Sequence, residues 1–273
     1  MSARPPQSQQ KRVTVPLVRE AKGRKKLTMV TAYDAPSARI VDEAGVDVAL
    51  VGDSLGMVIQ GRADTLGVTL EQMVYHTEIV ARSTARALVV GDMPFLTFQI
   101  SNERTIEAAG QLIRAGAAAV KLEGGGKIAE RIRAVTEIGI PVMAHLGLTP
   151  QSLHQMGGYK VQGRDAEAAR RLLDEAKRVQ DAGAFAVVLE GMPAPLAKQI
   201  TDQLSIPTIG IGAGLHCDGQ VLVFHDLVGL SGDRTPTFVR RYADLRVTAV
   251  EAVKKFKADV EAGKFPSEGE SYK

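Results

Sequence analysis

Short apolar runs recur along the chain, and several of them end in a side chain that can carry a charge. Residues 48–51 form one such run, which is followed at once by Gly52, Asp53 and Ser54. The same arrangement returns at later positions, where the runs end at Asp92, Glu123, His145 and Glu190. A run of four or five apolar residues has the length of one buried strand. The pattern therefore predicts strands with a titratable side chain at each carboxyl end.

Segments with helical character separate these runs along the chain. We expect strands at residues 27–31, 48–51, 87–91, 118–122, 141–144, 185–189, 208–211 and 220–224, and helices at 13–23, 36–45, 69–85, 102–115, 127–138, 166–182, 193–204 and 237–262. Only residues 212–218 separate the last two strands, so we expect a single helical turn there. Strands that alternate with helices, without a Gly-x-Gly-x-x-Gly motif after the first strand, favour a closed (β/α)8 TIM barrel over a dinucleotide-binding open sheet.

Three acidic residues at the predicted strand ends form a candidate metal site. In a parallel barrel the carboxyl ends of all strands meet at one rim, which is where barrel enzymes carry their chemistry. Asp53 and Asp92 each follow a glycine, which allows a sharp backbone turn, and Glu123 offers a third oxygen ligand. Oxygen ligands without neighbouring cysteines or clustered histidines suit a hard cation such as Mg²⁺ rather than zinc. Each acid alone could equally be a helix cap or a salt-bridge partner, but crowded like charges repel unless a cation neutralises them.

Lys121, His145 and Glu190 are further candidates at the same rim. Lys121 lies two residues before Glu123 and shares its strand face, so it should contact an anion, either the acids or an anionic substrate group. Glu190 ends a strand in apolar surroundings, which suits a general base that takes a proton from carbon. His145 is the competing base, although a lone histidine is more often a hydrogen-bonded structural group. The glycine-rich segment 146–164 is expected to cover the barrel mouth.

Composition and charge narrow the class of protein. The chain has 273 residues, of which 45% are hydrophobic, enough for one large α/β domain. We expect a basic tail with a short helix at residues 1–26 and a single barrel domain with C-terminal helices at 27–273. The tail holds eight Lys or Arg residues against one Glu, a net +7 that leaves −4 for the rest of a chain whose total is +3. Because the positive charge is confined to the tail, a nucleic-acid surface is not expected.

Cellular location follows from what the sequence contains. The chain lacks an apolar run that approaches the roughly 18 residues of a membrane span, and its first residues lack an apolar secretory segment. The single cysteine, Cys217, excludes an internal disulfide bond and is typical of a reducing compartment. We therefore expect a soluble, cytoplasmic protein without a membrane partner.

Several longer blocks resemble the ketopantoate hydroxymethyltransferase family. The matching blocks lie, in the same order as in the family, at residues 31–34, 50–57, 120–125, 145–152, 157–164, 209–214 and 225–226. The resemblance implies a (β/α)8 barrel of the phosphoenolpyruvate mutase and isocitrate lyase type, with an N-terminal helix and extra C-terminal helices. It also implies a homodecamer and a role in pantothenate biosynthesis, on the way to coenzyme A.

The resemblance assigns roles to individual residues. Asp53, Asp92 and Glu123 match the family's Mg²⁺ site, and Asp53, Ser54, Asp92 and Lys121 match positions that bind the 2-oxo acid. Glu190 matches the family's proton acceptor, which leaves His145 as a supporting or proton-transfer group. The implied reaction is Mg²⁺-assisted enolisation of 3-methyl-2-oxobutanoate, followed by transfer of a hydroxymethyl group from the co-substrate 5,10-methylenetetrahydrofolate, which gives 2-dehydropantoate and tetrahydrofolate.

Two other readings remain open at this point. A phosphoenolpyruvate mutase-like or isocitrate lyase-like enzyme would share the Mg²⁺ and 2-oxo acid site, but those lyases usually place a catalytic cysteine on a mobile loop, and Cys217 lies in a different connection. A catalytically silent barrel that serves as a scaffold would have no use for buried acids.

Overall fold

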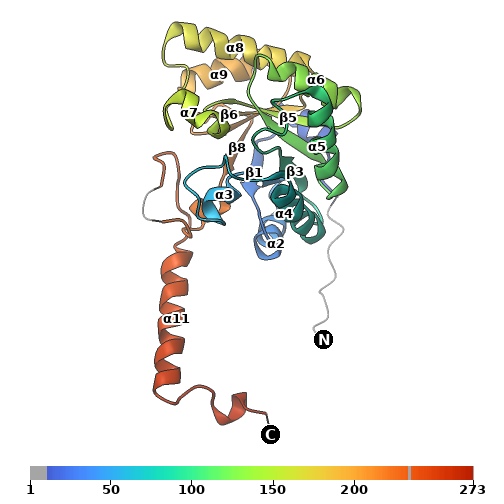
Figure 1. Ribbon diagram of the computed structural model, residues 1–273. Helices are drawn as coiled ribbons and strands as arrows, with labels where there is room; N and C mark the ends of the chain where they lie inside the picture. The colour runs from blue at the N-terminus through green and yellow to red at the C-terminus, as the bar shows by residue number, and fades with distance from the viewer. Residues whose placement is uncertain (1–10, 233–234, 273) are drawn as a thin grey trace. The chain divides into compact units, whose positions relative to one another are not determined.

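The computed structural model describes residues 11–232 and 235–272, and its centre is a closed barrel of parallel strands (Figure 1). Each strand pairs with its neighbours in chain order, and the last strand pairs with the first. The strands are β1 (Leu27–Thr31), β2 (Val48–Val51), β3 (Leu88–Asp92), β4 (Ala119–Glu123), β5 (Val142–Gly147), β6 (Ala186–Glu190), β7 (Thr208–Ile211) and β8 (Gly219–Leu222). The predicted TIM barrel is confirmed. Residues 1–10 of the predicted basic tail lie outside the described residues.

Helices follow most of the strands and lie outside the barrel, as α4, α5, α6, α8 and α9 show in Figure 1. The helices are α1 (Val15–Glu20), α2 (Ala35–Glu43), α3 (Leu55–Val58), α4 (Leu70–Ser83), α5 (Asn102–Arg114), α6 (Ile128–Glu137), η1 (Pro150–Ser152), α7 (Leu153–Met156), α8 (Ala166–Asp181), α9 (Ala194–Gln203), α10 (Phe224–Leu227), α11 (Leu245–Glu261) and η2 (Glu268–Glu270). No helix within 11–232 or 235–272 has both the length and the apolar character needed to cross a membrane.

Local hydrogen bonds explain where two of these helices begin. A capping box is present at α4, where the Thr69 hydroxyl accepts from the backbone N–H of Gln72 and the Gln72 side chain accepts from Thr69 N–H. Asp34 and Ser37 form the same arrangement at the start of α2. Such caps satisfy backbone N–H groups that have no partner inside the helix.

Apolar side chains of the strands fill the barrel, and α1 adds to them. Met29, Val48 and Met143 are almost completely buried, and Val18 of α1 belongs to the same cluster. Burying a side chain of this size contributes about 1.5–3 kcal/mol. Because Val18 packs together with Leu27, the first residue of β1, α1 covers the amino end of the barrel.

The connection between β7 and β8 corrects one prediction. Residues 212–218, all of them described, form bends rather than the expected helical turn. Gly212 and Gly214 have φ angles of 61° and 80°, in the left-handed region that a right-handed helical turn does not use. The Gln220 side chain instead donates to the carbonyl of Gly214 at 2.9 Å. The eighth strand also ends earlier than expected, because its pairing with β1 stops at Leu222 and Phe224 begins α10.

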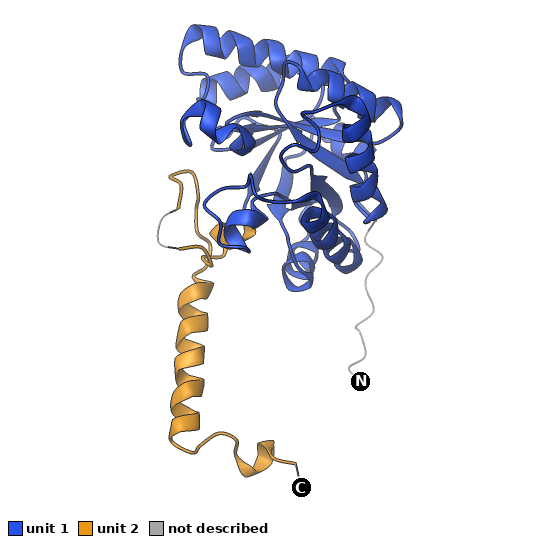
Figure 2. Ribbon diagram, viewed as in Figure 1, with its two compact units in different colours: residues 1–223 blue, residues 224–273 orange. Residues whose placement is uncertain are grey.

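The chain divides into two compact units, residues 1–223 and 224–273 (Figure 2). The first unit contains the barrel, and the second contains α10, α11 and η2. Of the terminal helices expected within 237–262, the structure has α11, which begins at Leu245, so helix before that residue was predicted wrongly. The turn at 236–239, closed by Val239 N–H donating to Pro236, takes the place of that first part. The division at residue 26 that the sequence suggested stays a prediction.

Candidate active site

Six charged or titratable residues lie at the carboxyl ends of five neighbouring strands. Asp53 follows β2, Asp92 ends β3, Lys121 and Glu123 lie on β4, His145 lies on β5 and Glu190 ends β6. The parallel register places Asp92 beside Lys121 and Glu123 beside His145. The structure thus brings together, at one rim, residues that are up to 137 positions apart in the sequence.

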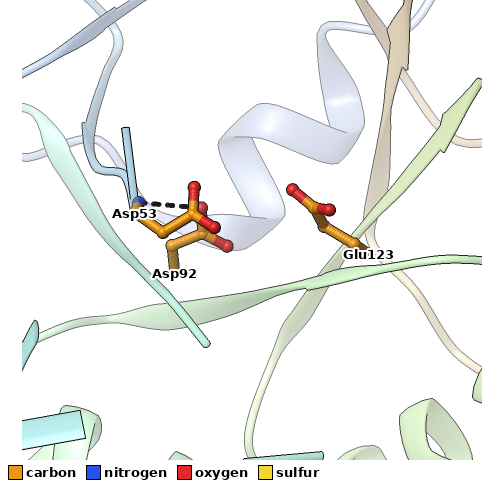
Figure 3. Close-up of side chains that lie close together, drawn as sticks. All are labelled: Asp53, Asp92 and Glu123. Carbon is orange, nitrogen blue, oxygen red and sulfur yellow. Dashed lines mark hydrogen bonds between the residues drawn. The ribbon is translucent and has the colours of Figure 1, made fainter. Parts of the chain in front are cut away.

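Asp53, Asp92 and Glu123 point toward one another (Figure 3). Each offers one carboxylate oxygen, and these oxygens all lie within 4.8 Å of one another. The backbone N–H of Asp53 donates to Oδ2 of Asp92 at 3.2 Å. All three side chains are buried, so water contributes little to their solvation.

Lys121 answers part of the question that the sequence left open, because it contacts the acids. Its Nζ lies 2.9 Å from Oδ1 of Asp92 and 3.5 Å from Oε1 of Glu123, and 3.3 Å from Nδ1 of His145. The Lys121 side chain is only 4% exposed, so these carboxylates are the groups that balance its charge.

His145 joins the acid cluster to Glu190. Its Nδ1 lies 3.3 Å from Oε1 of Glu123, and its Nε2 lies 3.1 Å from Oε2 of Glu190. The His145 side chain is 3% exposed whereas that of Glu190 is 16% exposed. Of the two candidate bases, Glu190 is therefore the one that a molecule in the barrel mouth can reach.

Burial and neighbouring charges shift the pKa values of the three carboxyl groups at this rim. Burial, together with the charges of Asp92 and Glu123, raises the pKa of Asp53 well above its ordinary value of 3.8. Burial also raises the pKa of Asp92, although Lys121 acts in the opposite direction. For Glu123, burial is outweighed by Lys121 and His145, so its pKa is lowered. The protein thus holds more negative charge here than its own cations neutralise.

The two basic residues respond to the same charges. Burial lowers the pKa of Lys121, but the carboxylates of Asp92, Glu123 and Asp53 outweigh it, and the net change is a rise. Burial and Lys121 lower the pKa of His145, but Glu123 and Glu190 outweigh them and raise it to about 9. The surrounding carboxylates thus favour the protonated form of both groups.

The residues of this site fit a hard divalent cation. Three buried carboxylates converge, which is the set of donors that Mg²⁺ or Mn²⁺ prefers. Among the described residues, Oδ1 of Asp92 has no well-aligned hydrogen-bond partner, since its contact with Lys121 is an ion pair of poor hydrogen-bond geometry. The raised pKa of Asp53 points the same way, because a cation would relieve the repulsion that causes it.

Two residues of the site were missed by the sequence analysis. Gln151, in η1, is buried and donates to both Asp53 and Glu123. Tyr33 follows β1, and its hydroxyl lies 2.8 Å from Oγ of Ser54. Both lie in blocks that resemble the family, which was the available signal, but neither follows a recognisable spacing of catalytic residues.

The segment 146–164 is more ordered than its composition indicated. It contains η1 and α7, and α7 ends at Gly157, whose φ of 66° is the left-handed conformation of a helix C-cap. Further along, the Tyr159 hydroxyl lies 3.6 Å from the sulfur of Met57 in α3. The segment therefore reaches across to the connection that follows β2, while its expected role as a cover stays a prediction.

Solved structures with this architecture define the class of protein. A 2,3-dimethylmalate lyase, described as a phosphoenolpyruvate mutase/isocitrate lyase superfamily member, is 20% identical with a TM-score of 0.60 and covers 95% of this chain and 92% of its own. A phosphonomutase-like protein from Burkholderia cenocepacia J2315 is 18% identical with a TM-score of 0.62, covering 91% and 98%. The chain thus has a (β/α)8 barrel of the phosphoenolpyruvate mutase and isocitrate lyase type, as predicted.

Within that class, the chain belongs to the ketopantoate hydroxymethyltransferase family, whose sequence pattern matches residues 12–268. The 3-methyl-2-oxobutanoate hydroxymethyltransferase of Geobacter metallireducens is 55% identical over 248 residues, which cover 90% of this chain and 93% of that protein. That of Pyrobaculum calidifontis is 54% identical over 259 residues, which cover 95% and 97%. The predicted family and the predicted enzyme class, a hydroxymethyltransferase, are confirmed, and neither the lyase nor the scaffold reading is favoured.

Proposed function

We propose that the protein transfers a hydroxymethyl group from 5,10-methylenetetrahydrofolate to 3-methyl-2-oxobutanoate, giving 2-dehydropantoate and tetrahydrofolate in pantothenate biosynthesis. Family membership over residues 12–268 supports the reaction. The observation that carries the proposal is the convergence of Asp53, Asp92 and Glu123 in a buried site beside Lys121 and His145. A barrel without this chemistry would gain nothing from burying three acids together.

Asp53, Asp92 and Glu123 are the residues that would hold Mg²⁺. A divalent cation bound there would supply Lewis acidity that draws electrons from the ketone of the oxo acid and makes its C3 hydrogen more acidic. The carboxylates that hold the cation lie at the ends of strands and on a packed barrel, so they are held in place before substrate arrives.

Lys121 and Ser54 orient the oxo acid. The Lys121 ammonium group is charged and buried, and a substrate carboxylate would gain a strong charge-assisted hydrogen bond from it. The Ser54 hydroxyl is held by Tyr33 and can donate to a second substrate oxygen. Asp53 and Asp92 would contribute to substrate binding through the cation that they would hold.

Glu190 accepts the proton from C3. His145 is not free for this task, because both of its ring nitrogens lie within 3.3 Å of carboxylate oxygens. The imidazole Nε2 instead lies against Oε2 of Glu190 at 3.1 Å, and Glu190 is the more exposed of the two side chains. As the proton leaves, C3 forms a bond to the one-carbon unit, and both bonds from that carbon to the folate nitrogens N5 and N10 break. A water molecule supplies the hydroxyl group, and the C3 proton and one proton of the water end on the two nitrogens of tetrahydrofolate.

Deuterium exchange tests the proton-removal step separately from folate chemistry. The protein is incubated with Mg²⁺ and 3-methyl-2-oxobutanoate in D₂O, and the C3 proton signal is followed by NMR. We expect the signal to disappear with enzyme and metal and to persist when EDTA replaces the metal. Addition of 5,10-methylenetetrahydrofolate should then yield 2-dehydropantoate. A C3 signal that persists beside correctly folded, metal-loaded protein would favour the scaffold.

The lyase alternative makes a different demand on the chain. It needs a reactive cysteine at the mouth, whereas Cys217, the single cysteine, is buried and burial raises the pKa of its thiol. Incubation with phosphoenolpyruvate or isocitrate should therefore give no product. A homodecamer and a cytoplasmic location also belong to this proposal, supported by the family resemblance, and light scattering of the purified protein measures the subunit number.

A further inference from the structure

Gln151 occupies an unusual position for an amide side chain. It lies in η1, within the segment 146–164 that follows β5, yet it is 5% exposed and reaches the acids of the site. Through Gln151 this irregular segment donates a side-chain hydrogen bond into the carboxylate cluster. A buried amide in an otherwise irregular segment is costly unless all its polar groups are satisfied.

The hydrogen bonds of Gln151 account for its whole side-chain amide. Its Nε2 donates to Oδ2 of Asp53 at 3.0 Å and to the carbonyl of Met93 at 2.9 Å, and its Oε1 accepts from Nε2 of Gln99 at 3.1 Å. Its backbone N–H donates to Oε2 of Glu123 at 3.0 Å. The orientation of the amide is chemically determined, because the carbonyl of Met93 only accepts hydrogen bonds and so must face the Nε2 group rather than Oε1.

These contacts connect three neighbouring strand ends. Asp53 follows β2, Met93 follows β3, and Glu123 ends β4, whereas Gln151 itself comes from the connection after β5. Gln151 binds one oxygen of Asp53 and one oxygen of Glu123, and so it sets the direction in which the second oxygen of each carboxylate points. Groups that orient metal ligands in this way typically affect metal affinity strongly.

We propose that Gln151 is a positioning residue that couples the seating of segment 146–164 to the assembly of the metal site. The inference rests on the proposed role of the acids in holding a cation. The segment is also attached near its ends, where Leu148 N–H donates to the carbonyl of Glu190 and Gln162 N–H donates to that of Gly191, both at 2.8 Å, and by the contact of Tyr159 with Met57. When the segment lifts, Asp53 and Glu123 lose their donors, and by reciprocity a bound cation favours the seated segment.

Metal affinity without substrate gives the first test. Gln151→Leu keeps the volume of the side chain but removes its donors, and Mg²⁺ binding is measured by calorimetry. We expect an affinity about 10–100-fold below that of the unaltered protein. Gln155→Leu is the matched control, since Gln155 lies in α7 of the same segment with an exposed side chain, and its affinity should be unchanged. Gln151→Asn, one methylene shorter, provides a milder second variant with a smaller loss.

Hydrogen–deuterium exchange of residues 146–164 gives the second test. Mg²⁺ should slow amide exchange in this segment in the unaltered protein and in Gln155→Leu, but not in Gln151→Leu. A residue that only stabilised the fold would lower the melting temperature and leave both the affinity and the Mg²⁺-dependent protection intact, which would overturn the inference and not the proposed function. If the unaltered protein binds no Mg²⁺, both the metal role of the acids and the coupling are wrong.

Discussion

The two ends of the barrel both bury aspartate side chains, but they treat them in opposite ways. Asp47 and Asp218 lie directly before β2 and β8, at the amino end, whereas Asp53 and Asp92 lie at the carboxyl end. All four are less than 8% exposed. Burial alone therefore does not distinguish an acid that stabilises the fold from one that is available for chemistry.

At the amino end, each carboxylate has a complete set of partners from the chain. Asp47 accepts from the backbone N–H and the hydroxyl of Thr28 at 3.0 and 2.9 Å and pairs with Lys25 at 2.6 Å. Burial acts to raise the pKa of Asp47, but Lys25 and Thr28 outweigh it and hold the pKa below 3.8. Lys22 at 2.8 Å and Thr208 N–H at 2.9 Å do the same for Asp218.

At the carboxyl end, three acids share one lysine and one histidine. The pKa of Asp53 and that of Asp92 are raised, which means that the fold disfavours their ionised forms. Such an arrangement lowers the stability of the folded protein. It is therefore typical of sites that are kept for function. The comparison supports the proposal that the acids at this end hold a cation from outside the chain.

Asp92→Asn should produce the largest effect of any change that probes this comparison. The substitution keeps the shape of the side chain but removes a charge from the cation site, so we expect Mg²⁺-dependent exchange of the C3 proton to fall below detection. The melting temperature should stay the same or rise, because a buried carboxylate with a raised pKa is removed. NMR exchange and thermal unfolding measure the two quantities. Full activity in this variant would remove Asp92 from the metal site.

Glu190→Gln should reduce proton exchange by about 10²–10⁴-fold, the usual contribution of a general base. The amide keeps the size of the side chain and can still contact His145, so oxo acid binding, measured by calorimetry with Mg²⁺ present, should be retained. His145→Ala is the comparison variant and should lower the rate less, because its imidazole positions Glu190. Exchange that survives in Glu190→Gln but disappears in His145→Ala would transfer the role of base to His145.

Asp47→Asn should show the reverse behaviour at the amino end. Removing this charge breaks the ion pair with Lys25, whose side chain is 62% exposed, and weakens the bonds from Thr28, which we expect to destabilise the protein by about 1.5–3 kcal/mol. Proton exchange by the folded protein should change less than twofold. Urea unfolding measures the stability, and NMR on the same sample measures the rate of C3 proton exchange. A variant of normal stability and low activity would mean that the two ends are not functionally distinct.

The candidate site could be predicted because, in a parallel barrel, the position of a residue relative to an apolar run determines the end of the barrel at which it lies. An acid directly after an apolar run lies at the carboxyl end of a strand, and all such ends meet at one rim. From the sequence alone, that rule predicts that Asp53, Asp92, Glu123 and Glu190 lie at the same rim. It also separates Asp47, which precedes its run, from Asp53, which follows the same run.

The features that could not be predicted depend on contacts between distant or irregular segments. Gln151 lies in a connection without periodicity, and its role depends on where η1 packs against three other strand ends. In the β7–β8 connection, Gly212 and Gly214 adopt left-handed backbone angles that prevent a helical turn. Glycine permits these angles but does not require them, so the sequence alone does not predict them. Apolar spacing does not encode either of these arrangements.

The pH dependence of stability should give the smallest and most specific difference between the two ends. The pKa of Asp47 is lowered by folding, so this group stabilises the fold above 3.8, and its contribution is lost as the pH falls through the folded-state pKa. The pKa of Asp53 is raised, so the folded state is favoured at low pH, and this advantage is lost as the pH rises from about 4 through the folded-state pKa.

Melting temperatures of Asp47→Asn and Asp53→Asn, compared with that of the unaltered protein in EDTA, should therefore change with pH in different windows. The loss of melting temperature in Asp47→Asn should shrink as the pH drops below 3.8, the ordinary pKa of an aspartate. At low pH the Asp47 carboxyl of the unaltered protein becomes protonated in both the folded and the unfolded state. The gain of Asp53→Asn should grow as the pH rises toward neutrality, and added Mg²⁺ should cancel it by stabilising the unaltered protein. If the melting temperatures of both variants change with pH in the same way and Mg²⁺ does not alter the difference from the unaltered protein, the acids at the carboxyl end are structural, like those at the amino end.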